Sequence, residues 1–320
     1  MSGLPATILV TGAGGFVPRA ITTALLRKGA HVVALDRQFD LPMVAAWRAI
    51  SDRVTLLQGD VLDLPDEEVD AVIHGAALTA SPEEAGQTVE DNLRANVLPL
   101  LHVLEWAQAR GAGRILLISS SGVYRATPPG PVVETHPVSP EGTYAIAKAM
   151  AESLAETLKR VYRRDVVCIR LSSIYGEGEF PRPSRPRTSK VAQFVRQALE
   201  SGRIDVSRPN EARDWTCAGD IAEVVTLLMA ADAPAESLYN VASQEVRSNR
   251  QVADSVAAAI PGTEVYAREP SESDGPPLTR LGYLSNARLV QEFGFTGWTP
   301  FDVGIRRVVS ATMHSMEAAS

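Results

Sequence analysis

The chain has 320 residues, of which 45% are hydrophobic and 22% are charged, a balance typical of a soluble globular protein rather than a disordered, collagenous or membrane one. Its 31 Lys and Arg against 38 Asp and Glu give a formal net charge of -7, which disfavours nucleic acid and anionic membranes as partners. The two cysteines, Cys168 and Cys217, are too few for a disulfide framework or a cysteine zinc site, so we expect a reduced, cytoplasmic setting and no metal.

The first half of the chain alternates apolar, strand-like runs with segments of helical periodicity. This alternation indicates an α/β fold with a parallel sheet that is covered by helices on both faces. The predicted strands are Thr7–Thr11, His31–Asp36, Val54–Gln58, Asp70–His74, Arg114–Ser119 and Asp165–Leu171. The predicted helices are Phe16–Lys28, Asn92–Arg110 and Thr143–Tyr162.

The pattern changes after Tyr175. Residues 176–187 (GEGEFPRPSRPR) are rich in Pro, Gly and Arg and predict a loop, and we expect residues 261–281 to be irregular. Because open α/β sheets bind ligands beyond the carboxyl ends of their strands, the seam between the sheet and a smaller C-terminal part is the predicted site. After this loop the sequence predicts helices at Ser189–Ser201, Asp220–Ala231 and Asn249–Ile260 and a strand at Leu238–Ala242.

The first predicted strand runs into a glycine-rich segment, TGAGGFVP at 11–18. Glycines permit a tight turn and the close approach of a pyrophosphate, and the following helix offers free N–H groups to its charge. Asp36 stands at the end of the next strand, twenty-one residues after Gly15. A carboxylate there can accept the ribose hydroxyls of NAD and would repel the 2′-phosphate of NADP, which Arg37 would favour. We therefore expect NAD as the cofactor.

Two further motifs carry chemistry. Tyr144 and Lys148 are four residues apart and therefore share one face of a predicted helix, where a nearby ammonium would favour the tyrosine phenolate as a base. Ser119, Ser120 and Ser121 follow the strand that ends near residue 119, and a hydroxyl there can hydrogen-bond a substrate oxygen. Together, after a nucleotide loop, the motifs predict acid–base catalysis at an alcohol or carbonyl.

The ordered series of motifs resembles the extended short-chain dehydrogenase/reductase family, the group of NAD-dependent epimerases and dehydratases. By this resemblance residues 1–175, joined by about 213–244, form a doubly wound NAD-binding Rossmann domain, and residues 176–320 form mainly the substrate-binding domain. Besides the glycine loop and Asp36, the motifs are GDV at 59–61, HGAA at 74–77, NV at 96–97, SSSGVY at 119–124, YAIAK at 144–148, RLSSIYG at 170–176, RDW at 213–215, YNVAS at 239–243 and an LV-EFGF-W-P tail at 289–300.

The resemblance implies that Tyr144 is the catalytic acid/base and that Lys148 orients the nicotinamide ribose and lowers the tyrosine pKa. Ser120 is the implied catalytic serine, with Ser119 and Ser121 as close competitors. Many relatives pair as homodimers through two long helices, and we expect the same here. The implied cofactor-binding residues are Gly12, Gly14, Gly15, Phe16, Val17, Asp36, Arg37, Asp60, Val61, Ala76, Ala77, Asn96, Ser119, Tyr144 and Lys148.

Departures from the family pattern bear on the reaction and the substrate. Family dehydratases usually carry an Asp-Glu pair directly after the catalytic Ser or Thr, where this chain has Ser121 and Gly122, so dehydration is disfavoured. Ser173 stands where nucleotide-sugar members typically have an Asn. Arg213 matches a diphosphate-contacting Arg of the family.

The arginines of the 176–187 loop would suit an anionic substrate, because guanidinium pairs bidentately with phosphate and carboxylate. The alternative is a solvated loop whose charges face water. With Arg213 they favour an anionic substrate, either a nucleotide sugar or a sugar acid. The predicted substrate-binding residues are Thr79, Ser120, Ser121, Ser173, Arg182, Arg185, Arg187 and Arg213.

The sequence thus predicts NAD-dependent chemistry at a secondary alcohol of a small, sugar-like molecule, with an epimerase as the first hypothesis. The alternative is a sugar or sugar-acid dehydrogenase or reductase whose NAD exchanges with solution. A third class, a non-catalytic NAD-sensing or scaffold protein, is disfavoured because both Tyr144 and Lys148 are present.

Overall fold

A seven-stranded parallel sheet forms the centre of the computed structural model, which describes residues 3–271, 274, 277 and 280–317. The strand order is β11-β7-β5-β4-β1-β2-β3, so the chain starts in the middle of the sheet and winds to both edges. This confirms the predicted doubly wound Rossmann-type fold. The strands are β1 (Thr7–Thr11), β2 (His31–Asp36), β3 (Val54–Gln58), β4 (Ala71–His74), β5 (Arg114–Ser120), β7 (Asp165–Leu171) and β11 (Leu238–Val241).

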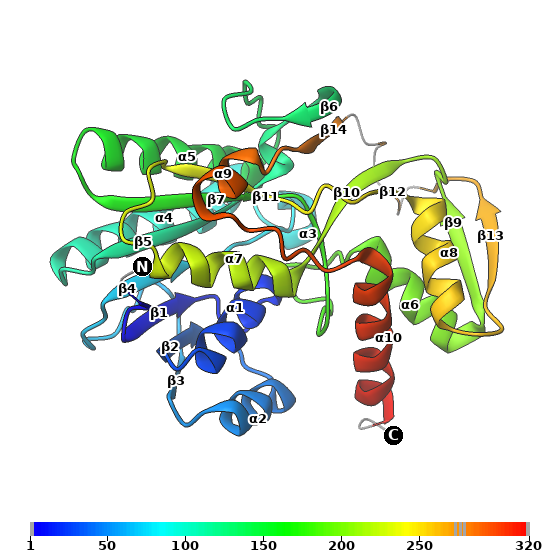
Figure 1. Ribbon diagram of the computed structural model, residues 1–320, viewed down its shortest axis with the longest axis horizontal. Helices are drawn as coiled ribbons and strands as arrows, with labels where there is room; N and C mark the ends of the chain where they lie inside the picture. Colours follow the sequence, from blue (N-terminus) through cyan, green and yellow to red (C-terminus); the bar gives the residue numbers. More distant parts are fainter. Residues whose placement is uncertain (1–2, 272–273, 275–276, 278–279, 318–320) are drawn as a thin grey trace.

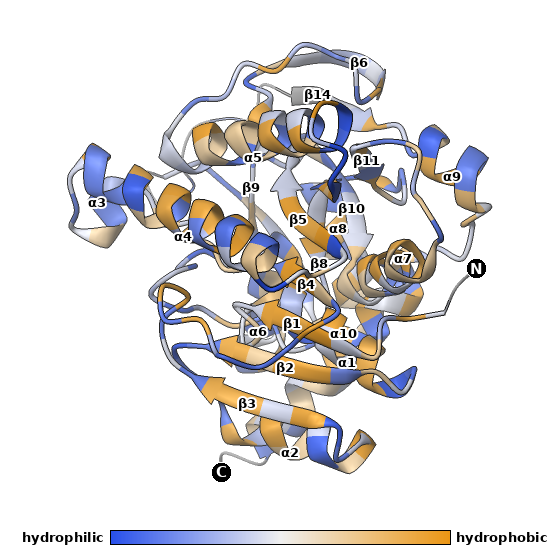
Figure 2. Ribbon diagram, turned by 90° about the vertical axis from the view of Figure 1, so that its left-hand side faces the viewer, coloured by the Kyte–Doolittle hydropathy of each residue, from blue (hydrophilic) through white to orange (hydrophobic). Residues whose placement is uncertain are grey.

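Helices cover both faces of this sheet. Alternate strand residues point to opposite faces, so Ile8 and Val10 belong to one hydrophobic core and Leu9 to the other. In Figure 2 the hydrophobic strands lie between these two helical layers. One layer holds α1 (Phe16–Arg27), α2 (Leu41–Ile50) and α7 (Ala218–Ala230), and the other holds α4 (Val89–Ala109) and α5 (Thr143–Arg160), with the short α3 (Pro82–Ala85) before α4.

Capping explains where the long helices begin. The side chain of Thr88 accepts a hydrogen bond from Asp91 N–H, which starts α4 three residues before the predicted Asn92 because Thr is a favourable N-cap. The glycine at 142, with φ +80°, precedes α5 at the predicted residue Thr143. Tyr144 and Lys148 therefore lie in the first two turns of a helix that packs on β5 and β7.

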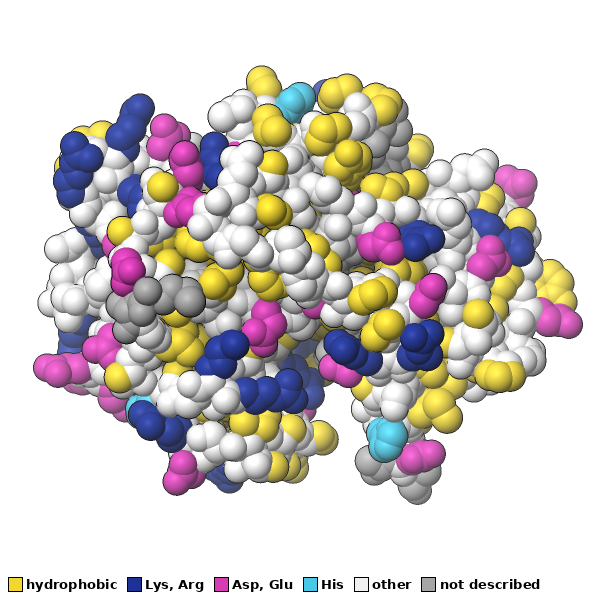
Figure 3. Space-filling model, viewed as in Figure 1, with side chains coloured by type: hydrophobic (Ala, Val, Ile, Leu, Met, Phe, Trp, Pro, Cys, Tyr) yellow, Lys and Arg dark blue, Asp and Glu magenta, His cyan; other side chains and the backbone are white. Residues whose placement is uncertain are grey.

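A separate hydrophobic core lies beyond the carboxyl ends of the strands. Figure 1 shows this part at the right of the sheet, and Figure 3 shows the notch between the end of its last helix and the α1–α2 side. Its helices are α6 (Lys190–Ser201), α8 (Asn249–Ala259) and α10 (Phe301–Glu317), and its strands are β8 (Ser173–Tyr175), β9 (Arg203–Ser207), β10 (Ala212–Cys217), β12 (Val246–Ser248) and β13 (Glu264–Arg268).

The prediction of an irregular segment over residues 261–281 was wrong in part. Residues 264–268 form β13, which pairs in parallel with β9, so that Val265 lies beside Ile204. A strand this short takes its stability from that distant partner rather than from its own sequence. In addition β14 (Arg280–Leu284) pairs with β6 (Thr127–Val132), and α9 (Ala287–Phe293) packs near β11. In the described part of the chain, no helix has the length and apolarity needed to span a membrane.

Candidate active site

The turn between β1 and α1 is shaped for an anion. Gly12 has φ +68°, and a β-carbon there would lie 2.7 Å from the backbone of Ala76, so only glycine fits. The N-cap of α1 is Gly15, which supplies no side-chain cap, and no acid stands in the first turn. The first N–H groups of α1, at Phe16 and Val17, are thus available to a negatively charged group.

Pro18 is built into this turn and explains a second motif. It lies in the first turn of α1, where its missing N–H costs no helical hydrogen bond. A β-carbon on Gly75 would lie 2.4 Å from Pro18 Cγ, so the residue that follows β4 must be glycine for α1 to approach. His74 Nδ1 hydrogen-bonds Thr11 Oγ1 at 2.9 Å, and burial lowers the pKa of His74 to about 3, which supports a packing role for this neutral imidazole.

Asp36 ends β2 beside the glycine turn. Its Oδ2 accepts from Gly14 N–H and its Oδ1 from Gln38 N–H, both at 3.0 Å. Arg37 instead turns to Asp60, to which its Nε donates at 2.9 Å. Asp60 and the buried Val61 follow β3 directly, so the ends of β2 and β3 form one rim of the site.

The opposite rim follows β4. Ala76 N–H donates to Thr11 Oγ1 at 3.4 Å, and Ala77 and Thr79 line the main cavity. Asn96 on α4 fixes this segment, because its side chain both accepts from Leu78 N–H at 2.9 Å and donates to Leu78 O at 3.0 Å. Asn96 therefore holds the rim without lining the cavity.

The main cavity has a volume of about 140 Å³ and brings the catalytic candidates together. Lys148 is buried, and burial lowers its pKa to about 8. Its Nζ lies 5.4 Å from the centre of the Tyr144 ring. Burial raises the pKa of Tyr144, and a hydrogen bond with Ser120 and the Arg185 guanidinium oppose that rise. The other residues that line this cavity are Gly14, Gly15, Phe16, Val17, Pro18, Gly75, Ile118, Ser119, Leu171, Ser172, Ile174, Gly178, Phe180, Arg182 and Ser184.

A buried polar network distinguishes the neighbouring serines. Ser119 Oγ donates to Glu152 Oε1 at 2.5 Å, and Arg170 donates to both oxygens of the same carboxylate, at 2.9 and 2.6 Å. The Ser119 hydroxyl proton is therefore used in a hydrogen bond to the buried Glu152. Ser120 Oγ accepts from Gly122 N–H at 3.0 Å and reaches Tyr144, so Ser120 has the better catalytic position.

Sequence reasoning did not single out Glu152. The signal was present, because Glu152 follows Lys148 by four residues and so shares the face of α5 that carries Tyr144. An acid on that inward face requires a buried cationic partner, and Arg170 on β7 supplies it.

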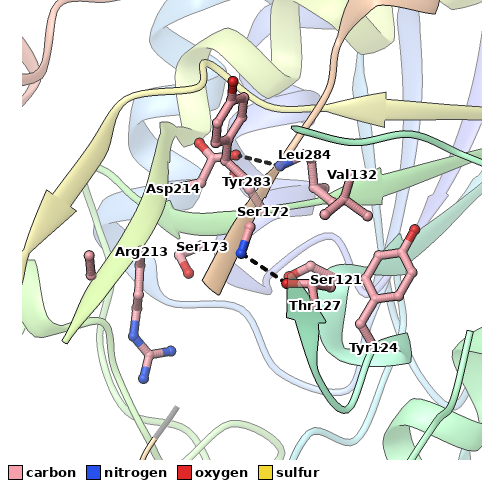
Figure 4. A pocket seen from close by; sticks show the side chains of 12 residues that line it. Ser121, Tyr124, Thr127, Val132, Ser172, Ser173, Arg213, Asp214, Tyr283 and Leu284 are labelled. Carbon is pink, nitrogen blue, oxygen red and sulfur yellow. Dashed lines mark hydrogen bonds between the residues drawn. The ribbon is translucent and has the colours of Figure 1, made fainter. Parts of the chain in front are cut away.

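A second cavity of about 40 Å³ adjoins the first, since Ser172 lines both. Figure 4 shows it enclosed by residues of β6, β10 and β14. Ser121, Ser173 and Arg213 lie there, as the predicted substrate contacts would. The remaining lining residues are Tyr124, Thr127, Val132, Ala212, Asp214, Gly282, Tyr283 and Leu284.

Asp214 is an unpredicted feature of this second cavity. It is 7% exposed, its Oδ2 accepts from Leu284 N–H at 3.2 Å, and its Oδ1 has no hydrogen-bond partner among the described residues. Burial raises the pKa of Asp214 to about 7. The second cavity thus offers several hydroxyls and a buried carboxyl group, and Arg213 beside them donates from Nη2 to Glu211 Oε1 at 2.7 Å.

We name residues 176–187 the arginine loop. Its three arginines, Arg182, Arg185 and Arg187, do not line the second cavity. Arg182 and Arg185 line the main cavity, where Arg182 Nη1 lies 3.7 Å from Asp36 Oδ1. Arg187 pairs with Glu84 of α3 at 2.5 Å and keeps 65% of its side chain exposed. The structure therefore places two of these predicted substrate ligands on the nucleotide side of the site.

A doubly wound sheet whose glycine turn adjoins a Ser-Tyr-Lys set is the arrangement of a nucleotide-dependent oxidoreductase of the short-chain type. Residues 8–242 match the model of the NAD dependent epimerase/dehydratase family. The chain therefore belongs to that family of extended short-chain dehydrogenases/reductases, whose cofactor is NAD.

The similar proteins catalyse different reactions. The chain is 26% identical to the dTDP-glucose 4,6-dehydratase of Streptomyces niveus over 317 residues, which is 94% of this chain and 91% of the relative. It is 26% identical to the dTDP-4-dehydro-6-deoxy-D-allose reductase of Streptomyces bikiniensis over 295 residues, 86% of this chain and 89% of the relative. The structure of the Thermus thermophilus UDP-glucose 4-epimerase with NAD has a TM-score of 0.79 and 26% identity, covering 96% of this chain and 99% of that one.

The residues present fit NAD. The free N–H groups of α1 suit its diphosphate, and the Asp36 carboxylate stands where it can accept ribose hydroxyls. In addition, Arg185 Nη1 is buried and lacks a hydrogen-bond partner among the described residues, so a donor is available inside the cavity. A bound NAD would supply the nicotinamide ring that exchanges a hydride with a substrate carbon.

Proposed function

We propose that the chain is an NAD-dependent epimerase of a nucleotide sugar or a similar anionic sugar derivative. The observation that carries this choice is the set of ionisable groups in the main cavity. Among its described lining residues there is no Asp or Glu, and Ser121 and Gly122 form a 3-10 turn beside Ser120. Elimination of water needs a further acid–base pair, whereas reversible oxidation of an alcohol needs only the Ser-Tyr-Lys set.

In this mechanism Tyr144, as phenolate, takes the proton of a secondary alcohol. Ser120 donates a hydrogen bond to the oxygen as it becomes a carbonyl. The groups that oppose the effect of burial on the pKa of Tyr144 are Ser120 and the Arg185 guanidinium, rather than the predicted Lys148, so the role left to Lys148 is to orient the nicotinamide ribose. Bound NAD would take up the hydride of the same carbon and supply it again once the keto sugar has turned in the cavity, and Tyr144 would return the proton to the oxygen. The substrate's charged end would lie in the second cavity, where Arg213 can pair with it.

The test combines a substrate panel with product analysis. The purified protein is given NAD and, separately, UDP- and dTDP-sugars, uronic acids and free aldoses, while NADH absorbance is followed and products are identified by NMR. A new stereoisomer without net NADH is the expected result. Net formation of NADH would instead establish a dehydrogenase. A product that has lost water relative to the substrate would establish a dehydratase. The Tyr144→Phe variant serves as the control for contaminating activity.

We also propose that the protein acts as a homodimer through α4 and α5. These helices expose Leu98 and Leu101 on α4 and Ile146 and Met150 on α5, each at least 37% exposed, and apolar surface of this kind favours a partner. Light scattering after gel filtration should give twice the chain mass. Met150→Glu should shift the protein toward monomer, and an unchanged monomeric mass for both proteins would refute the dimer.

A further inference from the structure

The arginine loop spans the main cavity from rim to rim. On one rim, Thr79 N–H donates to Ser184 O at 2.8 Å. On the other, Arg182 lies 3.7 Å from both Asp36 Oδ1 and Asp40 Oδ2. The loop therefore closes over the space in which the cofactor's diphosphate and adenosine ribose belong.

The two arginines are presented together by a tight turn. Arg182 N–H donates to Arg185 O at 3.0 Å, and Arg185 N–H donates to Arg182 O at 2.9 Å. Both side chains face inward, since both line the main cavity. A β-carbon on Gly14 would lie 3.0 Å from Arg182 Nη1, so this guanidinium lies directly on the glycine turn.

The Arg185 guanidinium is held in place by one ion pair, but not all of its hydrogen-bond donors have partners. Its Nη2 donates to Glu179 Oε1 at 2.6 Å, and that carboxylate, 1% exposed, also accepts from Ser189 N–H at 2.8 Å. Its guanidinium carbon lies 5.0 Å from the centre of the Phe16 ring, at the first residue of α1. Nη1 is buried with no hydrogen-bond partner among the described residues. A buried charged donor without an acceptor is unfavourable, and an anionic ligand would satisfy it.

We propose that Arg185 and Arg182 bind the diphosphate of NAD from the loop side, opposite the N–H groups of α1, and thereby keep NAD bound between turnovers. This inference rests on the proposed epimerase function, in which the cofactor that accepts the hydride must also return it. Guanidinium groups pair bidentately with phosphate oxygens, so the loop and the helix end would hold the same group from two sides.

The diphosphate of a nucleotide sugar has the same chemistry and is the competing ligand. NAD is favoured because Arg182 contacts Asp36, the carboxylate of the nucleotide turn, and because Arg185 packs on Phe16 of α1. The second cavity has its own cation in Arg213 and is lined by neither loop arginine.

The experiment measures cofactor retention directly. Arg185→Gln and Arg182→Gln are compared with the wild type and with Arg196→Gln, a control on the exposed side of α6. Each protein is loaded with NAD, passed over a desalting column and denatured, and the released NAD is quantified. Binding of NAD to the stripped proteins is measured by calorimetry, and thermal unfolding without NAD reports whether each variant folds.

The wild type and Arg196→Gln should retain close to one NAD per chain. Loss of a charge-assisted hydrogen bond should weaken NAD binding about 10- to 100-fold in Arg185→Gln, with a smaller loss in Arg182→Gln. Arg185→Lys should recover part of the affinity, because it restores the charge but not the planar fork. If Arg185→Gln does not fold, Arg182→Gln decides the question.

Retention equal to the wild type in both folded variants would overturn the proposal. So would unchanged NAD affinity with a raised KM for the sugar, which would assign the arginines to the substrate. Weakened NAD binding in a protein that proves to be a dehydrogenase would uphold the loop's contact with NAD and refute the epimerase, so the two failures are distinguishable.

Discussion

The two cavities that meet at Ser172 are built by different means. The main cavity is formed by strand ends of the central sheet, the glycine turn, the first turns of α1 and α5 and the arginine loop. The second cavity is formed by side chains on β6, β10 and β14, which lie outside the central sheet. A site built on the ends of the central strands suits a ligand common to a whole family, whereas a site built outside that sheet can change with the substrate.

The largest effect expected is at the main cavity. Tyr144→Phe removes the group that moves the proton and should lower turnover about 100- to 10,000-fold. NAD retention should be unchanged, because the phenol is not what holds the diphosphate. Steady-state rates and bound NAD check this, with Tyr162→Phe, an exposed tyrosine at the end of α5, as the matched control. Loss of NAD together with activity would contradict the assignment of Tyr144.

Next in size is the contrast between the serines. Ser120→Ala should lower kcat about 100-fold with little change in stability, because it removes a donor to the developing carbonyl oxygen. Ser119→Ala should keep most activity but destabilise the fold by about 1 kcal/mol, since Glu152 loses a buried donor. Rates and chemical denaturation of both variants are the measurements. The reverse pattern would show that Ser119 is the catalytic serine.

At the second cavity, Arg213→Gln should raise KM for an anionic substrate about tenfold. Its retained NAD should equal that of the wild type, because Arg213 does not line the main cavity. The exposed Arg250→Gln on α8 is the control. A parallel fall in NAD retention would erase the distinction between the two cavities.

The last prediction concerns the pH dependence of stability rather than catalysis. Because the pKa of Asp214 is raised to about 7 when folded, the folded protein holds this proton where the unfolded chain has lost it. Its stabilising contribution is therefore complete below pH 4 and is lost as pH rises through about 7. The stability of Asp214→Asn relative to the wild type should therefore be higher at pH 8 than at pH 5, by about 3 kcal/mol. Denaturation curves at both pH values test this, and a constant difference would refute the raised pKa.

The central sheet could be predicted because its strands carry their own signal. Runs such as Arg114–Ser119 are apolar throughout, as strands buried on both faces must be, and the catalytic motifs follow these runs directly in the chain. The glycine turn and Asp36 predicted the cofactor, and the family resemblance then gave the Ser-Tyr-Lys set its proposed roles.

The substrate side could not be predicted in the same way. Thr127 Oγ1 accepts from Gly282 N–H at 2.9 Å across 155 residues of sequence, and strands as short as β6 and β14 give no periodic signal for such a pairing. The burial of Asp214 could not be predicted either, because it depends on packing against the distant strand β14. The positions of the loop arginines could not be predicted for a similar reason. Pro and Gly indicate that residues 176–187 form a loop, but they do not indicate which part of the protein the loop packs against.

The face of α5 that carries Tyr144, Lys148 and Glu152 combines chemistry with anchorage. Tyr144 and Lys148 face the main cavity, and Glu152, about one turn beyond Lys148, is fixed by Arg170 of the sheet. Each residue added or removed between Lys148 and Glu152 would turn one end of the helix by about 100° relative to the other. The length of this segment is therefore under a stricter constraint than its composition: most single exchanges on its outer face should be tolerated, whereas a one-residue insertion or deletion would separate the catalytic pair from its anchor.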